Sequence, residues 1–263
     1  MLRTRIITAL ALGGVTSAAV LFLPTWALAV AFGSLWLAGT WEWTRFTGIQ
    51  RLSPVVYSAC FVVLMVAMGP LFDAQSALLV AVIAIAWWVL PSILLWSYPR
   101  GLSRAFVTIA GPLTLIPAWF LLSYLHGSGP QGPGLTLSLL LIIWAADVGA
   151  YLFGRRIGRV KLAPTISPGK TWEGVVGGVV SAALAAAVTG FVLEVPLGAF
   201  VAAALAATLV SVIGDLTVSM YKRNVGLKDS GRLLPGHGGV LDRIDSLSAA
   251  VPIFFVGLHI AGL

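Results

Sequence analysis

The stretch SALLVAVIAIAWWVLPSILLW, residues 76 to 96, runs for 21 residues without a charged side chain. A helix needs about 20 predominantly apolar residues to cross the hydrocarbon core of a bilayer, so this stretch predicts a membrane span. On either side of it lie eight further apolar stretches of similar length. They cover residues 6 to 23, 24 to 41, 54 to 72, 105 to 125, 135 to 153, 175 to 193, 197 to 218 and 247 to 263.

The composition agrees with a chain built for a bilayer. Of 263 residues, 59% are hydrophobic and 10% are charged, and the mean hydropathy is +1.00, a balance that ordinary soluble domains do not have. We therefore predict an all-α fold, a polytopic integral membrane helix bundle of about nine transmembrane helices, with residues 1–263 forming a single transmembrane domain. Only a turn at Pro24 separates the first two stretches, which leaves eight spans as the alternative.

The distribution of basic residues predicts the orientation of the chain. A formal net charge of +7 would indicate nucleic-acid binding in a soluble protein, but membrane proteins collect Lys and Arg on their cytoplasmic side. With the N-terminus placed in the cytoplasm, all 16 Lys and Arg residues fall on that side. A span count wrong by one would destroy this segregation. We therefore predict a cytoplasmic N-terminus and expect no nucleic-acid partner.

The acidic residues are concentrated in the second half of the chain. Residues 1–134 contain only Glu42 and Asp73 of the nine acidic residues. An ionisable group inside a span is costly, so it indicates a function or a buried partner, and Asp147 and Asp215 are two such groups. We expect the helices of residues 135–263 to carry the catalytic site, and those of residues 1–134 to form a scaffold and a lipid pocket.

Two clusters of side chains predict a site for a metal and phosphate. Helical spacing places Asp215, Ser219 and Lys222 on one face near the cytoplasmic end of the eighth stretch. Asp242 and Asp245 share a face at the start of the last stretch, where the positive end of the helix dipole also favours phosphate. Mg²⁺ takes oxygen ligands, usually from one or two carboxylates and substrate phosphates. We predict Mg²⁺ held by Asp215, Asp242 and Asp245, with a second cation left open.

The same charges have simpler explanations, which the sequence leaves open. The acids would then only form ion pairs with Arg223 or Arg243, and the basic loops would only orient the chain. Basic residues in Gly/Pro-rich loops beside the acids are nevertheless expected to clamp a triphosphate or an anionic lipid headgroup. They are Lys170, Lys222, Arg223 and Lys228.

The segment SMYKRNVGLKDSGRLLPGHGGVLDRID, residues 219 to 245, carries a long constrained motif. A Ser is followed after two residues by Lys-Arg, after four more by Lys-Asp, then by a Gly/Pro-rich turn with His-Gly-Gly and by Asp-Arg-apolar-Asp. This pattern resembles the signature of the phosphatidate cytidylyltransferase (CDP-diacylglycerol synthase) family. Tyr221 stands where the family usually has an aliphatic residue or Phe.

A second region resembles the same family. It comprises DVGAY at residues 147 to 151, Gly154-Arg155, and ISPGKTWEG at residues 166 to 174. Gly169 stands where a Lys is common, which predicts one weaker phosphate contact. The resemblance is strong over residues 147 to 174 and 215 to 245, and the multi-span layout agrees over the remainder.

The resemblance implies that CTP and phosphatidic acid react to give CDP-diacylglycerol and pyrophosphate in phospholipid biosynthesis, with Mg²⁺ required. It also implies a homodimer in the bacterial cell inner membrane, multi-pass, in contact with membrane lipid and with its active site facing the cytoplasm. The family's metal-site aspartates map to Asp215 and Asp242, with Asp245 close by. The residues expected to act in catalysis are Asp215, Asp242, Asp245, Lys222, Arg223 and His237. Those expected to bind substrate are Asp147, Ser167, Lys170, Thr171, Ser219, Lys228, Asp229 and Arg243.

Three questions stay open at this point. His237 is expected to orient a phosphate, to carry a proton or only to stabilise its turn. A transporter would also place acids in its spans, but transporters gather them near the midplane and often in paired halves, whereas these acids cluster at one edge. A CDP-alcohol phosphotransferase would carry an Asp-rich DGxxAR motif, which the sequence lacks.

Overall fold

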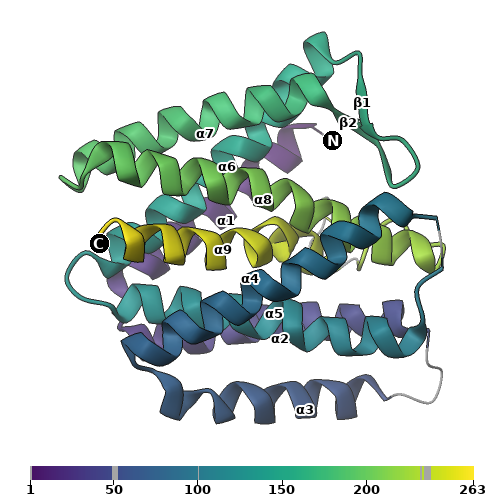
Figure 1. The fold of residues 1–263 in the computed structure, drawn as a ribbon, viewed down its shortest axis with the longest axis horizontal. Coiled ribbons are helices and arrows are strands. Elements are labelled where there is room, and N and C mark those ends of the chain that lie inside the picture. Colours follow the sequence, from purple (N-terminus) through teal and green to yellow (C-terminus); the bar gives the residue numbers. More distant parts are fainter. Residues whose placement is uncertain (1, 49–52, 100, 232, 234–237) are drawn as a thin grey trace.

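The computed structural model describes residues 2–48, 53–99, 101–231, 233 and 238–263, with side chains described from residue 10 onward. These residues form nine α-helices that lie lengthwise beside one another (Figure 1). In chain order the elements are α1 Leu2–Phe22, α2 Thr25–Thr47, α3 Pro54–Ala67, the 3₁₀ helix η1 Gly69–Leu71, α4 Ala74–Ser97, α5 Arg104–Gly127, α6 Gly132–Ile157, β1 Lys161–Ala163, β2 Ser167–Thr171, α7 Trp172–Val192, α8 Leu197–Asn224 and α9 Leu241–Ile260.

The predicted helix bundle is confirmed. Each of the nine apolar stretches corresponds to one helix, and the chain turns at Pro24 between α1 and α2 as expected. In the described part of the chain, seven helical segments are long and apolar enough to cross a membrane: Pro54–Leu71 and the helices α4 to α9. In α1 the described apolar part, Leu10–Phe22, is shorter, and α2 carries Glu42 and Arg45 in its last turns.

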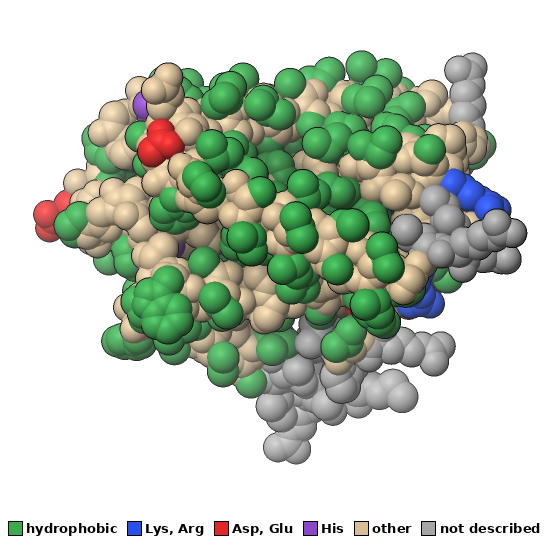
Figure 2. Space-filling view, turned by 90° about the horizontal axis from the view of Figure 1, so that it is seen from below, with side chains coloured by type: hydrophobic (Ala, Val, Ile, Leu, Met, Phe, Trp, Pro, Cys, Tyr) green, Lys and Arg blue, Asp and Glu red, His purple; other side chains and the backbone are tan. Residues whose placement is uncertain are grey.

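The outer surface is what a bilayer requires. Large apolar side chains in the middle of helices, such as Val63 of α3, Ile83 of α4 and Leu184 of α7, are exposed. Figure 2 shows this apolar covering on one face, with acidic side chains at one end of the helices and basic side chains at the other. Lipid tails satisfy such a surface, because burial of apolar area requires only that water be excluded.

Side-chain caps explain where several helices begin. Asp73 caps α4, and its carboxylate accepts hydrogen bonds from the backbone N–H groups of Gln75 at 3.1 Å and Ser76 at 3.0 Å. The hydrogen bonds from Ser76 lower the pKa of Asp73. Ser103 caps α5 in the same way, accepting from the N–H of Phe106 at 3.1 Å. These caps satisfy donors that a helix leaves unpaired at its start.

Glycines bring α6 and α7 into close contact. A Cβ added at Gly178 would lie 2.9 Å from the carbonyl oxygen of Ala146, and one at Gly174 would lie 2.9 Å from that of Ala150. No ordinary Cβ contact is that short, so the two backbones approach only because both positions lack a side chain. Small residues commonly allow such close approach between membrane helices.

α9 is the central helix of the second half. It packs against α8 on one side and against α4 and α5 on the other (Figure 1). Of an 18-residue apolar stretch of α9, 67% is buried inside the protein, the highest share among the seven membrane-length segments. Because α9 contacts helices from both halves of the chain, its first turn lies where the two halves meet.

Two features near the predicted site differ from the sequence-based expectation. α8 continues past residue 218 to Asn224, so Lys222 and Arg223 lie on its last turns and not in a loop. The segment between α6 and α7 is an antiparallel pair, in which β1 and β2 pair Lys161 with Thr171 and Ala163 with Ser167. Short strands without regular alternation give little signal in a sequence.

Candidate active site

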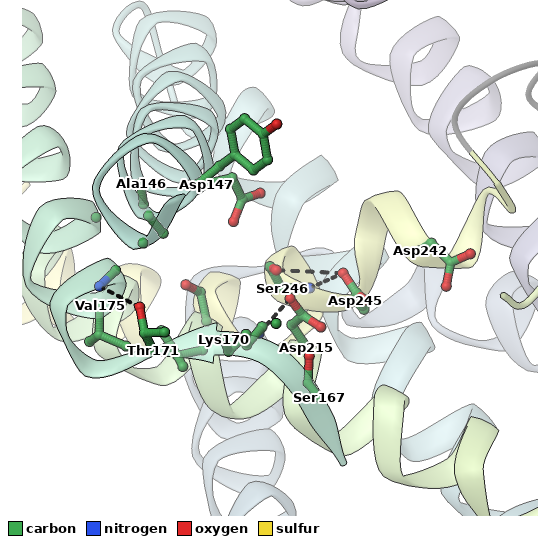
Figure 3. Close-up of a pocket in the computed structure, with 18 of the residues that line it drawn as sticks. Ala146, Asp147, Ser167, Lys170, Thr171, Val175, Asp215, Asp242, Asp245 and Ser246 are labelled. Carbon is green, nitrogen blue, oxygen red and sulfur yellow. Dashed lines mark hydrogen bonds and ion pairs between the residues drawn. The ribbon is translucent and has the colours of Figure 1, made fainter. Parts of the chain in front are cut away.

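A polar pocket of about 1110 Å³ lies among α6, α7, α8, the start of α9 and β2. Figure 3 shows the side chains that converge on it from these elements. Five acidic and five basic residues line it, so the described lining is balanced in formal charge. They are Asp147, Asp215, Asp229, Asp242 and Asp245, with Arg155, Lys170, Lys222, Lys228 and Arg243.

Asp215 of α8 is the centre of the acidic group. Its Oδ2 lies 2.6 Å from Nζ of Lys170 on β2, and its Oδ1 accepts a hydrogen bond from the Ser219 hydroxyl at 3.3 Å. Asp147 on α6 and Asp245 on α9 line the same pocket as Asp215. The hydrogen bond confirms that Asp215 and Ser219 share a face of α8, whereas Lys222, predicted for the same stripe, forms its ion pair with Asp242.

Asp242 has a different environment from Asp215 and Asp245. Its Oδ1 lies 2.7 Å from Nζ of Lys222, and both side chains are nearly buried. Its Oδ2 accepts hydrogen bonds from the backbone N–H groups of Ser230 and Gly239, each at 3.1 Å. Figure 3 shows the Asp242 carboxylate set apart from those of Asp215 and Asp245.

The three carboxylates predicted to hold Mg²⁺ do not lie in one preformed cluster in the described part of the chain. Among the residues that the structure describes, no three His, Cys, Asp or Glu side chains come close enough together to form a ready-made metal site. The physical reason is that Asp242 is already surrounded by one ammonium and two amide donors. The ion-pair alternative is correct in kind for Asp215 and Asp242, although the partners are Lys170 and Lys222 and not the two arginines considered.

The residues of β2 reach the pocket from its open side. Ser167, Lys170 and Thr171 all line it, as predicted. Thr171 has a second role, because its Oγ1 accepts a hydrogen bond from the N–H of Gly174 at 3.1 Å and so caps α7. The hairpin thus fixes both the start of α7 and the position of the Lys170 ammonium.

Several predicted residues lie outside the pocket lining. Arg223 donates to the carbonyl oxygens of Ile166 and Leu227, each at 3.1 Å, so it holds the hairpin against the end of α8. Ser219 reaches the site only through Asp215. His237 lies outside the described residues. Lys228, Asp229 and Arg243 do line the pocket.

Sequence reasoning missed Arg155 as a site residue. It lines the pocket together with Tyr151, and its Nη1 donates to the Tyr151 hydroxyl at 2.9 Å. The signal was present, because Tyr151 and Arg155 are four residues apart on a helix and share a face with Asp147. Arg155 adds a fixed positive charge on the α6 side of the pocket.

Comparison with known proteins places this chain among enzymes. Residues 3–261 match the model of the cytidylyltransferase family. The chain belongs to that family. A phosphatidate cytidylyltransferase of Pseudomonas aeruginosa is 43% identical over 270 residues, covering 100% of this chain and 98% of the relative. Those of Haemophilus influenzae and Brucella suis are each 38% identical, covering 97% of this chain and 97% and 92% of the relatives.

In this cytidylyltransferase the first N–H groups of α9 do not face the pocket, although the sequence predicted that this end of the helix would favour phosphate. The N–H groups of Val240 and Leu241 donate to the Glu42 carboxylate at 3.1 and 2.9 Å. The first half of the chain therefore reaches the edge of the site. It does so again where Asn224 exchanges two hydrogen bonds with the backbone of Leu102, at 2.9 and 3.2 Å.

Proposed function

We propose that this chain is a phosphatidate cytidylyltransferase, which transfers CMP from CTP to phosphatidic acid and gives CDP-diacylglycerol and pyrophosphate. The observation that carries the proposal is the charge-balanced pocket at one end of a membrane helix bundle, in a chain that belongs to the cytidylyltransferase family. Its volume of about 1110 Å³ lies slightly above the range of roughly 300–1,000 Å³ for small-ligand pockets, which suits two substrates better than one.

Mg²⁺ fits this pocket by the chemistry of its donors. Asp215 and Asp245 present carboxylate oxygens to the same cavity, and Mg²⁺ commonly takes one or two carboxylates together with substrate phosphates. We therefore assign the ion to Asp215 and Asp245, with Asp147 beside them. The acidic and basic residues of the lining balance each other, so they leave the negative charge of the phosphates uncompensated. When bound, Mg²⁺ would neutralise that charge.

The reaction needs positioning and charge stabilisation more than covalent chemistry. A phosphate oxygen of phosphatidate attacks the α-phosphorus of CTP in line, a P–O bond forms there, and the bond to the β-phosphate breaks as pyrophosphate leaves. Lys170, Lys228 and Arg155 line the cavity and would hold the phosphates and the negative charge that develops on pyrophosphate. Guanidinium groups suit the phosphate oxygens because they donate in a planar fork.

The setting of the enzyme is part of the proposal. The segregation of all 16 basic residues to one side supports a multi-pass protein of the bacterial inner membrane with the pocket facing the cytoplasm. CTP is then supplied from water and phosphatidate from the surrounding leaflet. The family resemblance supports a homodimer.

The assay for this function measures pyrophosphate release from purified protein in detergent. Phosphatidate and Mg²⁺ are mixed with CTP, ATP, GTP or UTP in parallel, and Asp245→Asn serves as the matched variant because it keeps the shape of the side chain. We expect pyrophosphate release with CTP and with none of the other three nucleotides, and we expect chelation of Mg²⁺ to abolish it. In Asp245→Asn the rate of release should fall at least 100-fold at a similar folded yield. Equal release with all four nucleotides, or none with CTP, would reject the assignment.

A further inference from the structure

Glu42 is a buried carboxylate in the half of the chain that carries little charge. It lies on α2 and is 2% exposed. Its Oε2 accepts hydrogen bonds from the Ser230 hydroxyl at 2.7 Å and the N–H of Leu241 at 2.9 Å, and its Oε1 accepts from the N–H of Val240 at 3.1 Å. A buried charge is tolerated only where donors replace water, and all three donors come from the signature segment.

The start of α9 depends on this carboxylate. The N-cap position, Val240, has no side chain able to accept a hydrogen bond from the first turn. A helix leaves its first N–H groups unpaired, and a negative charge near them is also favoured by the helix dipole. Glu42 therefore acts as the cap of α9 although it is 198 residues away from Val240 in the sequence.

Ser230 is held from three directions. Its hydroxyl binds Glu42 at 2.7 Å, its N–H donates to Asp242 at 3.1 Å, and its carbonyl oxygen accepts from Nη1 of Arg45 at 2.6 Å. Asp242 also accepts from the N–H of Gly239 at 3.1 Å. Asp242 thus joins Ser230 to Gly239, and Glu42 joins Ser230 to Val240. We call this place, where residues 230 and 239–240 come together at the base of the segment between α8 and α9, the neck.

Two glycines show how closely Glu42 fits this neck. A Cβ added at Gly231 would collide with Oε1 of Glu42, and one added at Gly239 would collide with Oε2 of Glu42 and with the Ser230 hydroxyl. Both positions therefore have to be glycine for the carboxylate to sit where it does. Gly239, the second glycine of the His-Gly-Gly in the signature, thus has a partner on α2.

We propose that Glu42 is a positioning residue for the cytidylyl transfer, acting together with Arg45. By fixing the neck at Ser230 and the first turn of α9, it sets where Asp242 meets Lys222 and where Asp245 faces the cavity. The inference rests on the proposed function, and it assigns to the first half of the chain a part in catalysis beyond that of a scaffold.

The test compares Glu42→Gln and Glu42→Asp with the wild-type chain and with Glu194→Gln, the same change at an exposed acid outside the site. A glutamine has one acceptor oxygen and an NH₂ that would face N–H donors, whereas aspartate keeps the charge on a shorter chain. At a temperature where all four proteins are folded, we expect kcat/KM for CTP to fall about 10–100-fold in Glu42→Gln, the range typical of residues that orient a site. Glu42→Asp should retain more activity, and Glu194→Gln should equal the wild type.

A second measurement does not depend on activity. Hydrogen–deuterium exchange of a peptide covering residues 238 to 245 should become at least 10-fold faster in Glu42→Gln, because Val240 and Leu241 bind different oxygens of Glu42 and the single amide oxygen of glutamine leaves one of them without an acceptor. Unchanged exchange, or unchanged kcat/KM per folded molecule despite lower stability, would overturn the proposal. If the wild-type chain itself released no pyrophosphate, the transferase assignment would fail, and the exchange experiment alone would decide whether Glu42 holds the neck.

Discussion

Replacing Lys222 by Met should destabilise the protein far more than the same change at Lys170. Both lysines form an ion pair with an aspartate, at 2.7 Å for Lys222–Asp242 and 2.6 Å for Lys170–Asp215. Their burial differs, because the side chains of the first pair are 9% and 10% exposed and those of the second are 26% and 30% exposed. Breaking a buried pair costs about 3–5 kcal/mol, whereas pairs open to water contribute about 1 kcal/mol or less.

The structure narrows the expected loss for Lys222→Met. Asp242 keeps the N–H groups of Ser230 and Gly239 as donors, so we expect about 3 kcal/mol, the lower end of that range for buried pairs. In Lys222→Met, a further change of Asp242→Asn should recover part of the loss, since it removes the charge left without a partner.

Denaturant unfolding of the detergent-solubilised protein, followed by tryptophan fluorescence, measures these differences. The signal reports unfolding of the whole bundle through ten tryptophans, among them Trp43, whose ring centroid lies 5.3 Å from that of Tyr221, the residue next to Lys222. Equal losses in Lys222→Met and Lys170→Met would refute the argument from burial. So would a double variant that is less stable than Lys222→Met alone.

Two further predictions concern packing and orientation. Gly178→Val should lower the free energy of unfolding by about 1–3 kcal/mol, because it overpacks the α6–α7 contact. Gly198→Val is the control, since no atom lies within 4 Å of a Cβ added there. Equal losses of stability in the two variants would argue against close contact between α6 and α7. Alkaline phosphatase fused after Leu263 should be active in bacterial cells, because nine spans from a cytoplasmic N-terminus place that end outside; an inactive fusion together with a fluorescent GFP fusion at the same residue would reverse the orientation.

Hydropathy was sufficient to predict the helices but not where they end. Nine apolar stretches predicted nine helices, because a bilayer demands apolar residues in every span. The ends were missed where a helix continues into polar residues, as α8 does to Asn224 and as α9 does by starting at Leu241. Tertiary partners stabilise those turns, and a window of hydropathy does not contain them.

The sequence predicted which residues line the cavity better than it predicted how they are arranged. Motif resemblance selected Asp147, Lys170, Asp215 and Asp245, which the structure brings to one cavity. It did not separate the surroundings of Asp242 from those of Asp215, since a motif gives only the residue types and their spacing. The difference comes from the amides of Ser230 and Gly239, which only the folded chain places there.

Glu42 shows most directly what the sequence did not predict. The apolar stretch was taken to end at residue 41, which put Glu42 in a loop, whereas α2 continues to Thr47 and carries the carboxylate inside the bundle. The cost of an acid within a helix of this kind was the available signal. Its partners lie almost 200 residues later, beyond the reach of any local pattern.

The distance between Glu42 and its donors has a consequence for biogenesis. When the ribosome has produced α2, the hydroxyl of Ser230 and the amides of Val240 and Leu241 do not yet exist. A truncated chain that stops before residue 230 therefore carries the Glu42 carboxylate without the three donors that bind it in the complete protein. Only completion of the last helix therefore supplies the carboxylate of α2 with these donors.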